Sequence, residues 1–267
     1  GEQRGNIGPV IEALMQALDC PFTIATPAFP DNQRTVFKGH LFVGDQLLSD
    51  SGMKDHPLTP MRESNLVKVL QAQCTQRVGL IDYRCVAQGS DAILQRIHEL
   101  KANGMGIAVV DALSNADLLR LGPALKHLPL VSAGSGVAIG LPGNWGIQPS
   151  VDSARLPNPQ GLQAIVSGSC SQATQSQVAH FIAQGGQAYQ LDPLAWPAHA
   201  PVAEIATHVL AWATPRVTQA PVLVYSTANA EQVMSAQQQR GTQQVGEHTE
   251  QVLAMVARGL VLSLIHI

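Results

Sequence analysis

The stretch Ser-Gly-Ser-Cys-Ser at residues 167–171 has the composition of an anion-binding turn. An apolar segment precedes it and a helical pattern follows it, so its backbone N–H groups and hydroxyls would face an anion at a helix N-terminus. An ordinary strand-to-helix turn with a serine N-cap fits the same residues. The stretch differs from a Walker A loop, because no Gly-Lys-Ser/Thr sequence follows it.

A second candidate is Arg34, which follows a proline-containing loop and opens a predicted strand. A planar guanidinium in that position is suited to hold a carboxylate through two parallel hydrogen bonds. A surface arginine on an edge strand is an equally good interpretation.

The polar loop at 51–61 is a third candidate, because two prolines restrict its backbone. We therefore predict that Asp55 and His56 point in a definite direction. The alternative is that His56 simply packs against or caps the neighbouring strands.

Other catalytic and metal-binding patterns do not occur in the sequence. Its nine histidines include no HExxH motif and no paired Cys/His spacing, so a transition-metal site is not expected. No GxSxG elbow indicates a serine hydrolase. The four cysteines lack CxxC spacing and are predicted to be reduced thiols of a cytoplasmic protein; they are Cys20, Cys74, Cys85 and Cys170.

Composition limits the classes of partner. The chain has 267 residues, of which 45% are hydrophobic and 13% charged, and its net charge is −3. That length suffices for one large or two ordinary domains. The slight negative charge and the 4% aromatic content argue against nucleic-acid and membrane partners. A small-molecule substrate remains, and the sequence leaves a homo-oligomer open.

Strand and helix patterns alternate along the chain, as they do in α/β proteins. We predict two α/β domains with mainly parallel sheets flanked by helices, each incomplete, and ligands outside the carboxyl ends of the strands. Ser114 and Asp117 have the spacing of a capping box. A first helix opening near Pro9 is predicted to bury an apolar stripe of Ile11, Leu14, Met15 and Leu18.

Four prolines without apolar periodicity at 142–160 mark the predicted domain boundary. The prediction is a first domain at 1–145, a linker at 146–160 and a second domain at 161–267. The chain begins without methionine and ends on an apolar run, which we interpret as a core strand lacking its partners or a spurious tail. We therefore expect a fragment of a longer protein, truncated at both ends.

Several long motifs resemble, in order, those of the four-carbon acid sugar kinase family. They include Arg-Gly-Asn-Ile-Gly-Pro-Val at 4–10, the stretch 26–61, Val-Val-Asp-Ala-Leu-Ser at 109–114, and the stretches 132–141 and 165–178. The Asp-His-Pro-Leu-Thr-Pro-Met version at 55–61 most resembles the 3-oxo-tetronate 4-kinase branch. The resemblance covers nearly the whole chain, from Arg4 to about Leu260.

The resemblance implies an ATP-dependent kinase, with Mg²⁺ accompanying the nucleotide, that phosphorylates the terminal (C4) hydroxyl of a tetronate or 3-oxo-tetronate. It implies a substrate domain followed by a nucleotide domain, with the site in the cleft between them. The matching substrate-side residues are Arg4, Gly5, Pro27, Arg34, Asp55 and His56. Ser169 matches the ATP-contacting position, with Ser171 and Thr174 as its near neighbours.

The chain also departs from the family pattern. Members begin with an Asp-Asp-x-Thr-Gly loop, expected to carry the catalytic carboxylate, and follow the last helix with a strand and a Gly-Gly-Glu-Thr loop. This sequence contains neither loop. No catalytic residue is therefore assigned within it, and we expect the chain by itself to be inactive or nearly so.

Two other functions stay open. A non-catalytic sugar-acid binding module would keep the substrate side and dispense with the nucleotide. An aldolase or isomerase would need a lysine at a strand end, whereas the five lysines are predicted in loops or on helices; they are Lys38, Lys54, Lys68, Lys101 and Lys126.

Overall fold

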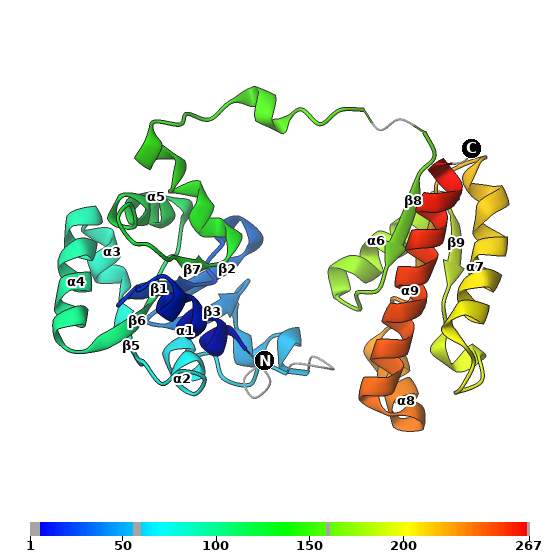
Figure 1. Ribbon diagram of the computed structural model, residues 1–267, viewed down its shortest axis with the longest axis horizontal. Coiled ribbons are helices and arrows are strands. Elements are labelled where there is room, and N and C mark those ends of the chain that lie inside the picture. The colour runs from blue at the N-terminus through cyan, green and yellow to red at the C-terminus, as the bar shows by residue number, and fades with distance from the viewer. Residues whose placement is uncertain (1–5, 56–59, 159–160, 266–267) are drawn as a thin grey trace. The chain divides into compact units, whose positions relative to one another are not determined.

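The structure, a computed structural model, describes residues 6–55, 60–158 and 161–265. The chain forms two compact units, Gly1–Arg155 (unit 1) and Leu156–Ile267 (unit 2). Each unit combines a parallel sheet with helices, so the predicted α/β fold class is confirmed (Figure 1).

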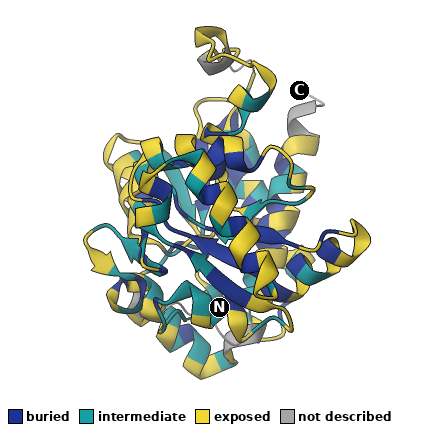
Figure 2. Cartoon of the chain, turned by 90° about the vertical axis from the view of Figure 1, so that its left-hand side faces the viewer, coloured by how far each residue is buried: buried dark blue, intermediate teal, exposed yellow. Residues whose placement is uncertain are grey.

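Unit 1 is built on a parallel sheet with the strand order β5–β6–β1–β7. β6 (Met105–Val110) pairs with β5 (Arg77–Ile81) and with β1 (Thr23–Thr26), and β1 pairs with the short β7 (Ser132–Ala133). Successive residues of β6 are buried, which indicates that both faces of the sheet are covered (Figure 2).

Helices provide this cover. α2 (Leu66–Gln71) and α4 (Ser90–Ala102) contact β5 and β6, while α1 (Ile7–Ala17) contacts α2 and α5 (Asn115–Ala124) contacts α4. The predicted capping box at the start of α5 is confirmed, because Ser114 accepts a hydrogen bond from the Asp117 N–H and Asp117 accepts one from the Ser114 N–H.

The predicted burial of the first helix is only half right. Ile11 and Met15 are buried, whereas Leu14 and Leu18 are 44% and 49% exposed. α1 begins at Ile7, and Gly8 lies against the turn after α2, where a Cβ would meet Gln73 at 2.6 Å. That close approach fixes the face that α1 turns inward, and the stripe of Leu14 and Leu18 lies beside that face.

A small antiparallel sheet lies between β1 and β5 in the chain. Its strands are β2 (Arg34–Phe37), which Arg34 opens as predicted, β3 (His40–Val43) and β4 (Gln46–Leu47). Val36 of β2 and Ala112, which follows β6, exchange two backbone hydrogen bonds of 2.9 and 3.0 Å. β2 is therefore attached to the chain just beyond the carboxyl end of β6.

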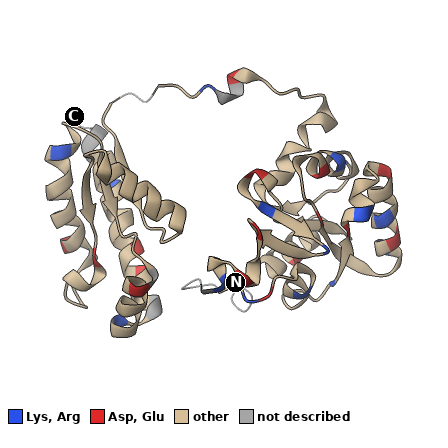
Figure 3. Ribbon diagram, turned by 180° about the vertical axis from the view of Figure 1, so that it is seen from behind, with Lys and Arg blue, Asp and Glu red and all other residues tan. Residues whose placement is uncertain are grey.

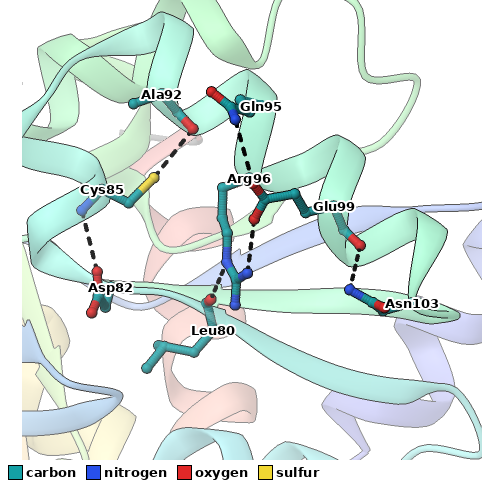
Figure 4. A network of polar contacts seen from close by, with 8 residues as sticks. All are labelled: Leu80, Asp82, Cys85, Ala92, Gln95, Arg96, Glu99 and Asn103. Atoms are coloured by element: carbon teal, nitrogen blue, oxygen red, sulfur yellow. Dashed lines mark hydrogen bonds and ion pairs between the residues drawn. The ribbon is translucent and has the colours of Figure 1, made fainter.

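A polar network fastens the short helix α3 (Tyr83–Ala87) at the end of β5 (Figure 4). Asp82 caps α3 by accepting the N–H groups of Arg84 and Cys85 at 3.2 Å, and the Cys85 thiol donates to the Ala92 carbonyl of α4 at 3.3 Å. Arg96 of α4 ion-pairs with Glu99 and donates to the Leu80 carbonyl of β5. These contacts hold α3 and α4 to the edge strand.

Unit 2 has a parallel sheet in the order β8–β10–β9. Its strands are β8 (Ala164–Ser167), β9 (Gln187–Gln190) and β10 (Val222–Tyr225), and its helices are α6 (Gln172–Ala183), α7 (Val202–Val217), α8 (Ala230–Arg240) and α9 (Thr242–Ile265). α7 packs along α9, and the core of unit 2 includes Val209 and Val256, which are both fully buried.

The interpretation of the last apolar run as a core strand is wrong. α9 continues through it to Ile265. Val256 and Leu260 are buried at a helical spacing of four residues, whereas Val261 and Leu262 are 56% and 48% exposed. An apolar run of this length does not distinguish helix from strand, and here the packing partner α7 selects the helix. Within the described ranges, no helix is long and apolar enough to cross a membrane.

A carboxylate on α1 gives a test of this architecture. Oε1 of Glu12 accepts hydrogen bonds from the Thr75 N–H and hydroxyl and from the Gln76 N–H, at 2.7–2.8 Å. Burial raises the pKa of Glu12, but the hydrogen bonds from Gln76 and Thr75 lower it by more. The pKa of Glu12 therefore lies below its ordinary value of 4.5.

A lowered pKa in the folded state means that Glu12 stabilises the fold above its unfolded-state pKa and loses this effect as the pH falls through the folded-state pKa. We expect Glu12→Gln to lower the free energy of unfolding by about 1 kcal/mol at pH 7 and by less at pH 3.5. Urea titrations at both pH values measure this, with the exposed Asp45→Asn as control. An equal loss at both pH values would contradict the charge-dependent role.

Candidate functional site

A buried carboxylate lies at the carboxyl edge of the unit 1 sheet. Asp111 follows β6 and is 0% exposed. It accepts three backbone hydrogen bonds: from Lys38 at 2.7 Å, from Gly39 at 2.8 Å and from Tyr83 at 2.9 Å. The carboxylate thus joins the end of β6 to the turn between β2 and β3 and to the first residue of α3.

The environment of Asp111 shifts the pKa of its carboxyl group. Burial raises the pKa of Asp111 above its ordinary value, the hydrogen bonds from Gly39, Lys38 and Tyr83 oppose the rise, and the charge of Asp82 adds to it. The sequence analysis missed Asp111 as a site residue. The available signal was an aspartate directly after a wholly apolar strand, a position at which a charge needs partners.

The loop after β1 is pressed against the loop after β7. The Gly134 N–H donates to the Thr26 carbonyl at 2.9 Å, and a Cβ on Gly134 would lie 3.4 Å from the Pro27 oxygen. A Cβ on Gly136 would lie only 2.3 Å from the Ala28 oxygen, so this approach needs glycine. Pro27 therefore shares this edge of the sheet with the glycine-serine turn at 133–136.

Arg34 lies beside the same loop. Phe29 and Arg34 exchange backbone hydrogen bonds of 2.8 and 3.1 Å, which bring Pro27 and Arg34 to one end of β2. The side chain is half-buried, and within the described part of the chain its guanidinium makes no hydrogen bond or ion pair. A half-buried guanidinium without an internal partner is suited to an external carboxylate.

The other predicted substrate-side residues are placed less fully. Asp55 ends a short 3-10 helix, Gly52–Asp55. The Met61 N–H donates to the Met53 carbonyl of this helix at 3.0 Å. The helix follows β4 and so lies, like Arg34, in the segment between β1 and β5. Arg4, Gly5 and His56 lie outside the described residues.

In unit 2, the predicted hydroxyl turn lies between β8 and α6. The Ser169 hydroxyl accepts the Ser171 N–H at 3.3 Å, and the Ser171 hydroxyl caps α6 by accepting the Thr174 N–H at 3.2 Å. The hydroxyls of Ser171 and Thr174 are 2.9 Å apart. The structure therefore brings Ser169, Ser171 and Thr174 together, and N-capping already uses Ser171.

The residues after β10 lie beside this turn. The hydroxyls of Ser167 and Thr227 are 3.1 Å apart, and the Ser226 N–H donates to the Ser167 carbonyl at 2.9 Å. Thr227 is 5% exposed. The carboxyl ends of β8 and β10 thus present hydroxyls and backbone amides side by side.

Charged side chains are absent from this part of the sequence. Residues 161–183 contain no Asp, Glu, Lys or Arg, and Figure 3 shows α6 uncharged along its length. Of the three arginines in unit 2, Arg216 stacks on Trp212, Arg240 donates to the carbonyls of Pro193, Leu194 and Trp196, and Arg258 is exposed on α9. The turn and α6 themselves therefore offer an anion only neutral donors.

No three His, Cys, Asp or Glu side chains gather as a metal site among the residues that the structure describes. His40, the first residue of β3, is held between Ser64 Oγ at 3.0 Å and Asn65 Nδ2 at 3.4 Å. Both of its ring nitrogens are therefore occupied by neighbouring side chains.

Comparison with known proteins assigns a domain type to each unit. The family model "Sugar-binding N-terminal domain" matches residues 2–141, and the family model "Nucleotide-binding C-terminal domain" matches residues 164–266. A Cupriavidus necator protein named 3-oxo-tetronate kinase is 48% identical over 96% of this chain and 59% of its own length. The Escherichia coli protein of the same name is 39% identical, over 96% of this chain and 66% of its own length.

Two solved structures are similar to the chain in fold and in sequence. A Salmonella typhimurium LT2 protein described as a putative tRNA synthase superposes with a TM-score of 0.72 at 36% identity, over 97% of this chain and 61% of that one. A Haemophilus influenzae protein gives a TM-score of 0.60 at 35% identity, over 97% and 62%. The chain spans about three fifths of the length of the curated relatives that it matches.

The contact between the two loops of unit 1 can be tested by adding one methyl group. Gly136→Ala places a Cβ 2.3 Å from the Ala28 oxygen, so we expect it to lower the free energy of unfolding by about 1–3 kcal/mol. Gly143→Ala is the matched control, because nothing lies within 4 Å of its Cβ position. Urea titration measures both; equal stabilities would show that the loops are not in contact.

Proposed function

The chain belongs to the family that joins a sugar-binding N-terminal domain to a nucleotide-binding C-terminal domain, and we propose that it is part of an ATP-dependent kinase of four-carbon sugar acids. The proposed reaction transfers a phosphoryl group to the terminal (C4) hydroxyl of a 3-oxo-tetronate or tetronate. The observation that carries the proposal is the likeness, along nearly the whole chain, to relatives named 3-oxo-tetronate kinase.

Unit 1 is the proposed sugar-acid unit. A four-carbon sugar acid carries one carboxylate, and the unpartnered guanidinium of Arg34 offers it two parallel hydrogen bonds. Pro27 lies at the same end of β2 and would border the ligand. Asp55 and His56, stiffened by Pro57 and Pro60, are proposed to meet its hydroxyls. Arg4 and Gly5 complete the proposed set.

Unit 2 is the proposed nucleotide unit. Ser169, Ser171 and Thr174 surround the N-terminus of α6, where backbone amides and the helix dipole favour phosphate oxygens. Because residues 161–183 carry no charged side chain, much of the phosphate charge must be balanced by other cations. Mg²⁺ bound with ATP would supply such charge, and the hydroxyl oxygens here are ligands that Mg²⁺ accepts.

No catalytic residue is proposed within the chain. Asp111 is an unsuitable general base, because its carboxylate is fully buried and already accepts three N–H groups. Because no part of Asp111 is exposed, its oxygens cannot reach a substrate hydroxyl. The described residues bind and orient the two ligands in this proposal, and the base that accepts the C4 hydroxyl proton is not among them.

Separate titrations test the two ligand sites. We expect isothermal calorimetry on the 267-residue chain to detect ATP·Mg²⁺ and, independently, a four-carbon sugar acid such as erythronate. Binding of the acid without any binding of ATP would favour the alternative, a non-catalytic sugar-acid module. The uncharged surroundings of the turn at 167–171 are the observation that favours that alternative. Binding of neither ligand would contradict both.

The role of Arg34 gives a sharper test. Replacing it by alanine removes two charge-assisted hydrogen bonds, worth about 2–3 kcal/mol, so we expect sugar-acid affinity to fall roughly 30- to 150-fold. Arg34→Lys should recover only part of it, because an ammonium lacks the planar fork. ATP affinity should not change in either variant.

The matched control is Arg120→Ala, which removes an exposed arginine whose partner is Asp117 on α5. Calorimetry at one ionic strength compares all three variants with the parent chain. If Arg34→Ala and Arg120→Ala lowered acid affinity equally, the effect would be one of net charge and the proposed carboxylate contact would be wrong.

A further inference from the structure

The turn between β2 and β3 has an uncommon backbone. Both of its residues adopt positive φ angles, 50° for Lys38 and 77° for Gly39. Two successive left-handed residues are typical of a type I′ hairpin turn, but such a conformation is unfavourable for lysine. A specific interaction is therefore needed to favour this turn with lysine in its first position.

Asp111 supplies that interaction. Its Oδ2 accepts the Lys38 N–H at 2.7 Å and its Oδ1 accepts the Gly39 N–H at 2.8 Å, so one carboxylate fills the concave pair of amides. Its Oδ2 also accepts the Tyr83 N–H at 2.9 Å. The rings of Phe37 and Tyr83 then pack with their centroids 4.7 Å apart.

This contact fixes the far end of the strand that carries Arg34. Arg34 and Lys38 are four residues apart, or about 13 Å along an extended chain. The Phe29–Arg34 pair holds one end of β2, the Val36–Ala112 pair holds its middle, and Asp111 holds the turn. Without Asp111, the turn keeps the hydrogen bond from the Leu66 N–H to the Gly39 carbonyl at 2.8 Å, but it loses its attachment to the end of β6 and to the start of α3.

We propose that Asp111 is a positioning residue, which sets the direction of β2 and thereby places the Arg34 guanidinium for sugar-acid binding. The inference rests on the proposed function of Arg34. Asp111 touches neither ligand and acts only through the backbone of Lys38, Gly39 and Tyr83. An asparagine would fill the same space, but its amide group would turn a donor toward these donors.

Asp111→Asn is the test, with Asp117→Asn as the matched control. Asp117 is also a carboxylate that accepts backbone N–H groups, those of Leu113 and Ser114, but it caps α5 and does not contact the hairpin turn. Calorimetry with erythronate is run at a temperature at which both variants are folded. We expect Asp111→Asn to lower the affinity at least about tenfold and Asp117→Asn to leave it unchanged.

Residue-resolved hydrogen exchange separates this proposal from the function on which it rests. In Asp111→Asn, the amides of Lys38, Gly39 and Tyr83 should exchange faster, while those of β1 and β6 keep the rates of the parent chain. If the parent chain does not bind the acid, the proposed function fails, and the exchange result still decides whether Asp111 holds the turn. Unchanged exchange at the three amides would overturn the proposal.

Equal losses of affinity in Asp111→Asn and Asp117→Asn would overturn it as well, because a general loss of stability would then explain both. Gly39→Ala provides a second approach if Asp111→Asn does not fold. It strains the same turn at a φ of 77° and leaves Asp111 in place. It should reproduce the loss of acid affinity, and an unchanged affinity with an altered turn would count against the proposal.

Discussion

Parallel strands bring all of their carboxyl ends to one edge of a sheet, and this constraint determines where the candidate residues of each unit meet. In unit 1 the ends of β1, β6 and β7 gather Pro27, Asp111 and the turn at 133–136. In unit 2 the ends of β8 and β10 gather Ser167 and Thr227 beneath the turn at 167–171. In each unit, residues far apart in the sequence therefore meet at one edge of the sheet.

The two edges differ in their chemistry. The edge of unit 1 carries a half-buried cation, Arg34, and a fully buried carboxylate, Asp111. The corresponding turn of unit 2 offers hydroxyls, backbone amides and the thiol of Cys170, and residues 161–183 contain no Asp, Glu, Lys or Arg. A planar charged fork selects carboxylates by geometry, whereas neutral amides at a helix N-terminus tolerate the variable charge of a phosphate chain and its metal. This difference agrees with the domain types that the comparisons assign.

Local signals in the sequence were sufficient for the alternation of strands and helices and for the capping box at Ser114 and Asp117, because each depends on residues a few positions apart. Contacts made at long range were not predictable. Asp111 meets partners 73, 72 and 28 positions away, and no periodicity indicates such pairings. The exposure of Leu14 and the helical end of α9 likewise depend on which neighbour packs against the segment.

The protonation of Asp111 indicates why a carboxylate is kept in this position. Its pKa is raised in the folded protein, because burial, aided by the nearby charge of Asp82, outweighs the three hydrogen bonds. A carboxyl whose pKa rises on folding binds its proton more tightly in the folded state, so the free energy of unfolding falls as the pH rises from the unfolded-state pKa through the folded-state pKa. The ionised group therefore lowers stability at neutral pH relative to its protonated form. The ionised carboxylate instead determines the geometry of the turn, because a group that only accepts hydrogen bonds can hold the two left-handed turn residues and the start of α3 at once.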